Sequence, residues 1–143
     1  MTPPDEGMAV VGWLASFVLL LLPALVLALS FAGWFGRANL AGTVAAETAR
    51  AVVLGDVADD ATTDALSVAD ALLARDGLAR ADACATESCA RVTIDGGLER
   101  GQLVRVSVDV RMPSLHIPFL GDVAGPRWTA VHNERVDDFR SIP

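Results

Sequence analysis

The first long pattern in the chain is an apolar run without interruption by charge. Gly7 to Gly36 contains no charged residue, and Met8 to Ala32 consists almost entirely of Val, Leu, Ala and Phe. At about 1.5 Å per residue, a helix of this length reaches roughly 45 Å, and the hydrocarbon core of a bilayer is about 30 Å thick. The run therefore predicts a transmembrane helix over residues 8–36, preceded by a polar leader over residues 1–7.

Two other interpretations of this run compete with a transmembrane helix. A buried core helix would need the remaining 107 residues to wrap a long helix that is apolar on all sides, which is too much surface for so few residues. A cleaved secretory signal carries basic residues before a short apolar core of about 7–15 residues. The leader MTPPDEG has no Lys or Arg and the run is longer than that. Small residues around Ser30, Phe31 and Ala32 keep the signal alternative open.

Beyond Arg37 the helical pattern continues as a stripe of small residues. Ala38, Ala41, Ala45 and Ala49 recur at spacings of three and four, which predicts one helix from about Met8 to Leu54 with a stop at Gly55. Such a stripe allows close packing against another helix, and it is equally suited to cover the protein's own globular part. The helix-packing candidates are Gly12, Gly33, Gly36, Gly42, Ala45 and Ala49.

The remaining pattern predicts an α+β ectodomain over residues 37–143. A second helix is expected from about Asp60 to Arg75, with Gly77 as its C-cap. Apolar alternation predicts three antiparallel strands. These are Arg91 to Ile94, the stretch in which Val104, Val106, Val108 and Val110 alternate with polar residues, and Arg127 to about Glu134. Between the last two strands, Pro113 to Pro126 is expected to form a long apolar loop.

Charge narrows the range of partners without settling the orientation. The chain has 143 residues and a net charge of −7, and residues 37–143 carry 11 Arg against 16 acidic residues. This balance argues against binding to nucleic acid or to an anionic membrane surface. Asp5 and Glu6 precede the apolar run and Arg37 follows it, so the positive-inside rule by itself places the C-terminal part in the cytoplasm.

The two cysteines argue for the opposite orientation. Cys84 and Cys89 are close in sequence, and a local disulfide between them would need an oxidising compartment outside the cytoplasm. Two buried thiols are the first alternative. A metal site is the second, but it would need His116 and His132 as further ligands, and these show no ligand spacing.

No catalytic constellation is visible in the sequence. Ser30 and Ser114 lie in no nucleophile-elbow context, and Gly96, Gly97 and Gly101 are typical of a hairpin, not of a phosphate-binding loop. We therefore expect a protein that is not an enzyme, with no cofactor, no catalytic residue, no bound metal and no small-molecule substrate.

The order of motifs resembles one known family. A leader ending in Asp5-Glu6-Gly7, followed directly by Met8 and the apolar run, is similar to a type IV prepilin processing site. The stretch WFGRANLAGTVAAETARAVV, a second Ala-rich helix, a valine-alternating strand, the segment LHIPFLG and a last strand ending in ERVDDFR follow in that order. This arrangement resembles the TadE-like pilus assembly proteins, the minor pilins of tight-adherence systems, over nearly the whole chain.

The resemblance implies a mechanical function. A prepilin peptidase would cut after Gly7, Met8 would become the N-terminus, and the helix would hold the subunit in the cell membrane until it packs against other pilin or pseudopilin subunits. It implies a single-pass protein with an extracytoplasmic C-terminal domain, or incorporation into a pilus. Ile117, Phe119 and Leu120 are candidates for a partner loop, with the alternative that they cap the sheet's own core.

One position departs from the family pattern. The family usually has glutamate at the fifth residue after the cut, where this chain has Gly12. In type IV-like pilins that carboxylate is thought to pair with the N-terminal amine of a neighbouring subunit, and a buried pair of this kind sets register more than it adds stability. Its absence leads to the hypothesis of a tip or initiating subunit. A drifted position in an uncleaved single-pass scaffold, or in a receptor-like subunit of an envelope complex, is the alternative.

Overall fold

The computed structural model describes residues 5–55, 58–117 and 121–137 of the chain. It divides into two compact units, Met1–Gly33 and Trp34–Pro143. Helix α1, Asp5–Leu54, begins in the first unit and ends in the second, and Pro23 lies inside it. The helix therefore starts a few residues before the predicted start at Met8 and stops at Leu54 as predicted.

The second unit confirms the predicted α+β class. After α1 come α2, Ala58–Arg75, and a four-stranded sheet with the strand order β1-β2-β3-β6. The strands are β1 (Ala79–Arg80), β2 (Cys89–Asp95), β3 (Leu103–Arg111) and β6 (Arg127–Arg135). A separate pair of short strands consists of β4 (Leu115–Ile117) and β5 (Gly121–Val123).

The expectation of three antiparallel strands is corrected in two respects. Strand β1 adds a fourth, which pairs in parallel with β2 through Ala79↔Cys89 and Arg80↔Ala90. Two residues are too few to display the alternation by which strands are recognised. The expected loop between Pro113 and Pro126 contains the antiparallel pair β4–β5.

An ion pair connects β1 to α2. Arg80 Nε donates to Asp70 Oδ1 at 2.7 Å, and a terminal nitrogen of Arg80 donates to Asp70 Oδ2 at 3.0 Å. The hydrogen bond from this guanidinium lowers the pKa of the Asp70 carboxyl below its usual range. The two-pronged geometry orients the short β1 strand relative to the helix that precedes it.

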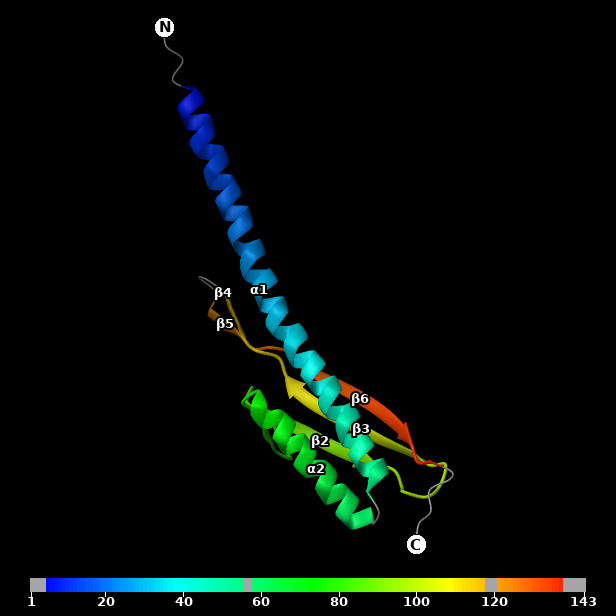
Figure 1. Ribbon diagram of the computed structural model, residues 1–143. Coiled ribbons are helices and arrows are strands. Elements are labelled where there is room, and N and C mark those ends of the chain that lie inside the picture. The colour runs from blue at the N-terminus through cyan, green and yellow to red at the C-terminus, as the bar shows by residue number, and fades with distance from the viewer. Residues whose placement is uncertain (1–4, 56–57, 118–120, 138–143) are drawn as a thin grey trace. The chain divides into compact units, whose positions relative to one another are not determined.

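The core lies on one face of the four-stranded sheet. Val104, Val106, Val108 and Val110 of β3 are buried, and the end of α1 and α2 cover this face (Figure 1). The helices contribute mainly small side chains to the core cluster. These are Ala41, Val44, Ala45, Ala49 and Val52 from α1, and Ala65, Ala69 and Leu73 from α2.

The ends of the two helices explain how the chain turns back onto the sheet. At Gly55 a Cβ atom would overlap the Cβ atom of Ala61, so only glycine allows the start of α2 to lie this close to the end of α1. At the other end of α2, Gly77 has a φ of 70°, and Leu78 N donates to Leu73 O at 3.0 Å. This is a Schellman motif, and it brings Leu78 into the core beside Leu73.

Two side chains near the start of the second unit attach α1 to loops. Trp34 Nε1 donates to the carbonyl of Pro113 at 3.1 Å, and Arg37 donates to the carbonyl of Glu87 at 2.8 Å. The carboxylate of Glu87 in turn accepts from the backbone nitrogen of Ser114 at 2.8 Å. Arg37, which marks the end of the apolar run in the sequence, is therefore also a structural contact.

The burial of small α1 side chains in the core generates a first prediction. Ala45 is fully buried, so Ala45→Leu should overpack the core and lower the stability of the second unit by about 2 kcal/mol. In the full chain in detergent micelles, amide hydrogen exchange in β3 should accelerate about 30-fold, as measured by mass spectrometry.

Gly42 provides the matched control for this prediction. It lies on the same helix, and a Cβ atom there would meet nothing within 4 Å. Gly42→Ala should therefore slow the same exchange, because alanine favours helix by about 1 kcal/mol over glycine. Wild-type exchange rates in Ala45→Leu would contradict the described packing of α1.

Candidate functional site

The N-terminal part of α1 presents an apolar surface that nothing in its own unit covers. Among the described residues, one helix, Val10–Leu54, is long and apolar enough to cross a membrane by length and composition. Large side chains such as Trp13, Leu19 and Leu20 are more than two-thirds exposed. Ser16 Oγ donates to the carbonyl of Gly12 at 2.8 Å, so this hydroxyl is satisfied within the helix.

The predicted helix-packing residues fall into two groups. Ala45 and Ala49 are fully buried in the protein's own core. Gly33 is exposed, and at Gly12, Gly36 and Gly42 a Cβ atom would meet nothing within 4 Å. The alanines therefore form a face that is used within the chain, whereas the four glycines lie on surface that the chain itself leaves open.

Other predicted residues lie at the edge of the described structure. Gly7 and Met8 belong to α1, whose first described residue is Asp5. Ile117 is the last residue of β4, while Phe119 and Leu120 lie outside the described residues. The partner-loop interpretation stays a prediction.

The cysteines form a disulfide that closes a short loop before β2. Cys84 and Cys89 are joined with a Cα–Cα distance of 5.6 Å. Of the two histidines considered as metal ligands, His132 Nε2 lies 3.0 Å from Glu134 Oε2, and the side chain of His116 lies outside the described residues. The disulfide corresponds to the first of the three interpretations of this cysteine pair.

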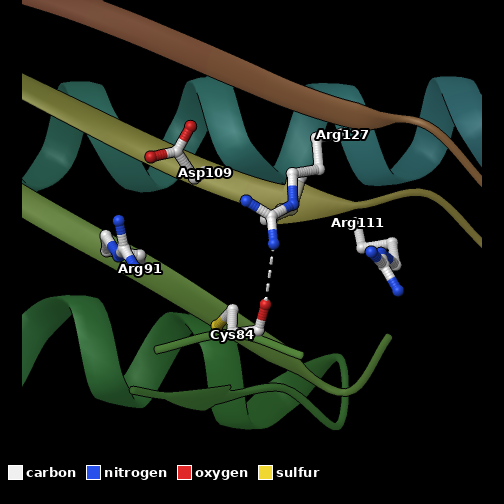
Figure 2. Close-up of a pocket in the computed structure, with 6 residues that line it drawn as sticks. Cys84, Arg91, Asp109, Arg111 and Arg127 are labelled. Atoms are coloured by element: carbon white, nitrogen blue, oxygen red, sulfur yellow. Dashed lines mark hydrogen bonds between the residues drawn. The ribbon is translucent and has the colours of Figure 1, made fainter. Parts of the chain in front are cut away.

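The outer face of the sheet, opposite the helices, is rich in arginine. The strand registers place Arg91 across from Asp109, Asp109 across from Thr129, and Arg111 across from Arg127. A cavity of about 80 Å³ opens on this face, and Figure 2 shows Arg91, Asp109 and Arg127 on the side of the sheet away from the helices. The arginine pocket, as we name it, is lined by Cys84, Arg91, Asp109, Val110, Arg111 and Arg127.

Hydrogen bonds from two of these arginines attach the disulfide-closed loop to the sheet. A terminal nitrogen of Arg127 donates to the carbonyl of Cys84 at 3.2 Å (Figure 2), and a terminal nitrogen of Arg111 donates to the carbonyl of Ala85 at 3.1 Å. The hydroxyl of Thr129 donates to the carboxylate of Asp109. The pocket thus combines three guanidinium groups with one carboxylate.

The arginine pocket is not evident from the sequence alone. The alternation in β3 indicates only that polar residues lie on the face opposite the valines. A signal was present, because Arg91, Arg111 and Arg127 occupy outward positions of three separate strands. Their convergence depends on strand register, which a one-residue slip would reverse and which the alternation alone does not specify.

Comparisons of the chain with protein-family models, with curated proteins and with solved structures find no match.

The disulfide gives a second prediction. Closing a loop with a sequence separation of 5 stabilises the folded state by about 2 kcal/mol in the chain-entropy model. The variant Cys84→Ser/Cys89→Ser should lose about this amount in urea unfolding of the full chain in detergent.

A reducing agent supplies the control for the disulfide prediction. Dithiothreitol should destabilise the wild type to the level of the double variant and leave the double variant unchanged. Equal stability of reduced and oxidised wild type would contradict the stabilising role of the disulfide.

Proposed function

We propose that this protein is a minor pilin or pseudopilin of a tight-adherence type IV-like pilus or secretion system. The observation that supports this most directly is the difference in exposure between the two parts of α1. Its N-terminal part exposes apolar side chains from Val10 to Phe31, and its C-terminal part is integrated into a folded core through Ala41, Ala45 and Ala49. One helix therefore combines a membrane-length segment with a structural element of the polar unit.

The proposed mechanism follows from the exposed apolar surface. In the bilayer, lipid tails cover residues 10–33, and all backbone groups of a helix are satisfied internally. A subunit that leaves the bilayer must cover the same surface with other apolar helices, because uncovered surface of this size would stay in lipid. Gly12, Gly33 and Gly36 would allow such helices to approach closely.

The disulfide supports an extracytoplasmic location for the C-terminal unit. Stable disulfides form in oxidising compartments and are rare in the cytosol. The positive-inside rule by itself indicates the opposite orientation, but it depends here on one arginine after the apolar run, Arg37, and on two acidic residues before it.

A second candidate function is an uncleaved, single-pass scaffold or receptor-like subunit of an envelope complex. One observation favours it: α1 begins at Asp5, so the bond between Gly7 and Met8 lies within a helix. A peptidase would have to open this first turn before cutting, and helix ends open at low free-energy cost. The two functions differ in the mature N-terminus of the protein.

The third prediction addresses this difference. In a host with a prepilin peptidase, intact-mass and peptide mass spectrometry should find the mature protein beginning at Met8. Gly7→Leu should leave the leader attached, and Gly12→Leu, which also replaces a glycine in the same helix, should be processed normally. An intact leader in the wild-type protein would favour the scaffold, and an N-terminus near Gly33 would identify a secreted protein.

The fourth prediction concerns Gly12. A side chain there meets open space, so Gly12→Glu should fold and insert with an unchanged C-terminal unit. If the missing carboxylate marks a tip or initiating subunit, Gly12→Glu should move the protein from a substoichiometric position into filament fractions.

Gly12→Gln is the neutral control for this experiment, because it adds the same bulk without the charge. Unchanged assembly and localisation of Gly12→Glu would mean that the absent carboxylate has no role in placing the subunit.

A further inference from the structure

The arginine pocket carries an electrostatic arrangement that the fold alone does not require. Arg111 and Arg127 are directly opposite each other on neighbouring strands, where like charges destabilise a sheet. Arg91 brings a third guanidinium group to the same cavity, against the single carboxylate of Asp109. The carbonyls of Cys84 and Ala85 offset part of this repulsion, but they carry no formal charge.

The donors of the pocket are incompletely used. Arg111 Nε is buried and has no hydrogen-bond partner among the described residues. In the same described part of the chain, the guanidinium group of Arg91 makes no hydrogen bond or ion pair. A buried donor without a partner costs about 1–3 kcal/mol. An incoming carboxylate would satisfy such donors, since its two oxygens match the fork of a guanidinium group.

We propose that the arginine pocket binds a carboxylate from the acidic start of α2 in a second copy of this chain. Asp60 and Asp64 are exposed and one helical turn apart, and neither has an ion-pair partner among the residues that the structure describes. No basic residue occurs between Arg50 and Arg75, so their negative charge is not compensated along the helix.

The fold makes this contact intermolecular. Helix α2 packs on the core face of the sheet, and the arginine pocket opens on the opposite face (Figure 2). The acids of one copy therefore cannot fill the pocket of the same copy. The contact joins two different surfaces, so each pair of copies leaves one pocket and one acidic helix free for the next copy.

The net negative charge of the chain does not prevent the contact. At physiological ionic strength the Debye length is about 8 Å, so distant charges on the two copies are largely screened while a direct guanidinium–carboxylate pair is retained. The proposal extends the proposed function by naming a partner and its site. It rests on that function only in placing several copies in one membrane, and it does not depend on cleavage after Gly7.

The test uses the absence of lysine from the chain. Arg91→Lys keeps the positive charge and introduces the one side-chain amine of the protein. Treating the full chain in liposomes with a zero-length carbodiimide couples that amine to a carboxylate in contact with it, as an amide with loss of water. We expect a covalent dimer, and mass spectrometry should identify the linked peptides as Lys at position 91 with Asp60 or Asp64.

Three controls make the result decisive. Arg105→Lys places the same amine on the same face of the sheet outside the pocket, and it should give no dimer above the wild-type background from the N-terminal amine. Coupling of the new amine to Asp109 within one copy shows that the reagent reached the pocket. Asp60→Asn/Asp64→Asn in the Arg91→Lys background should reduce the dimer at least tenfold.

Each alternative result would overturn the proposal. Coupling to Asp109 without a dimer would mean that no second copy occupies the pocket. A dimer of equal yield in Arg105→Lys would show non-specific proximity. A third result would identify lipid phosphate as the occupant of the pocket. In liposomes that contain anionic lipids, both the wild-type background and the dimer would be lost, whereas both would persist in liposomes without these lipids. Because the N-terminus is read from the same spectra, failure of this contact and failure of leader processing are distinguished.

Discussion

The packing of the four inward valines of β3 against the alanine-lined face of α1 is the contact on which the rest of the structure depends. The helix contributes mainly small side chains to this buried cluster, and the β-branched side chains of β3 fill much of its remaining volume. Because β3 pairs with β2 on one side and β6 on the other, this contact also sets which face of each neighbouring strand is turned outward. The arginine pocket lies on the outward face for this reason, since its strand residues other than Val110 occupy the outward, alternate positions of these strands.

The parts of the fold that were predicted from the sequence are those with a strong local period. The valine alternation over residues 104–110, the stop at Gly55 and the cap at Gly77 each have a physical cause within a few neighbouring residues. Strand β1 has two residues and pairs in parallel with β2 only because α2 returns the chain to that edge. The β4–β5 pair and the arginine pocket likewise depend on register between segments, and no local pattern specifies it.

The candidate helix-packing residues show that local spacing also does not specify which partner a helix face contacts. From spacing, the glycines and alanines after residue 32 form one stripe of small residues. In the structure Ala45 and Ala49 are committed to the internal core, and Gly36 and Gly42 face open space. The distinction arises from the rotation of α1 relative to β3, a tertiary property. Small residues on a helix therefore predict that something packs closely, but the structure decides whether the partner lies within the chain or outside it.

The chain order of the pocket has a consequence for biogenesis. Helix α1 is synthesised before any of the described strands, while Arg127 lies on β6, which follows the other described strands in the chain. Asp60 and Asp64 are therefore present on a growing subunit well before β6 pairs with β3 and aligns Arg127 with Arg111. An incompletely synthesised copy therefore contains the acidic start of α2 but not yet a complete arginine pocket. The arginine pocket is therefore complete only when β2, β3 and β6 are all paired.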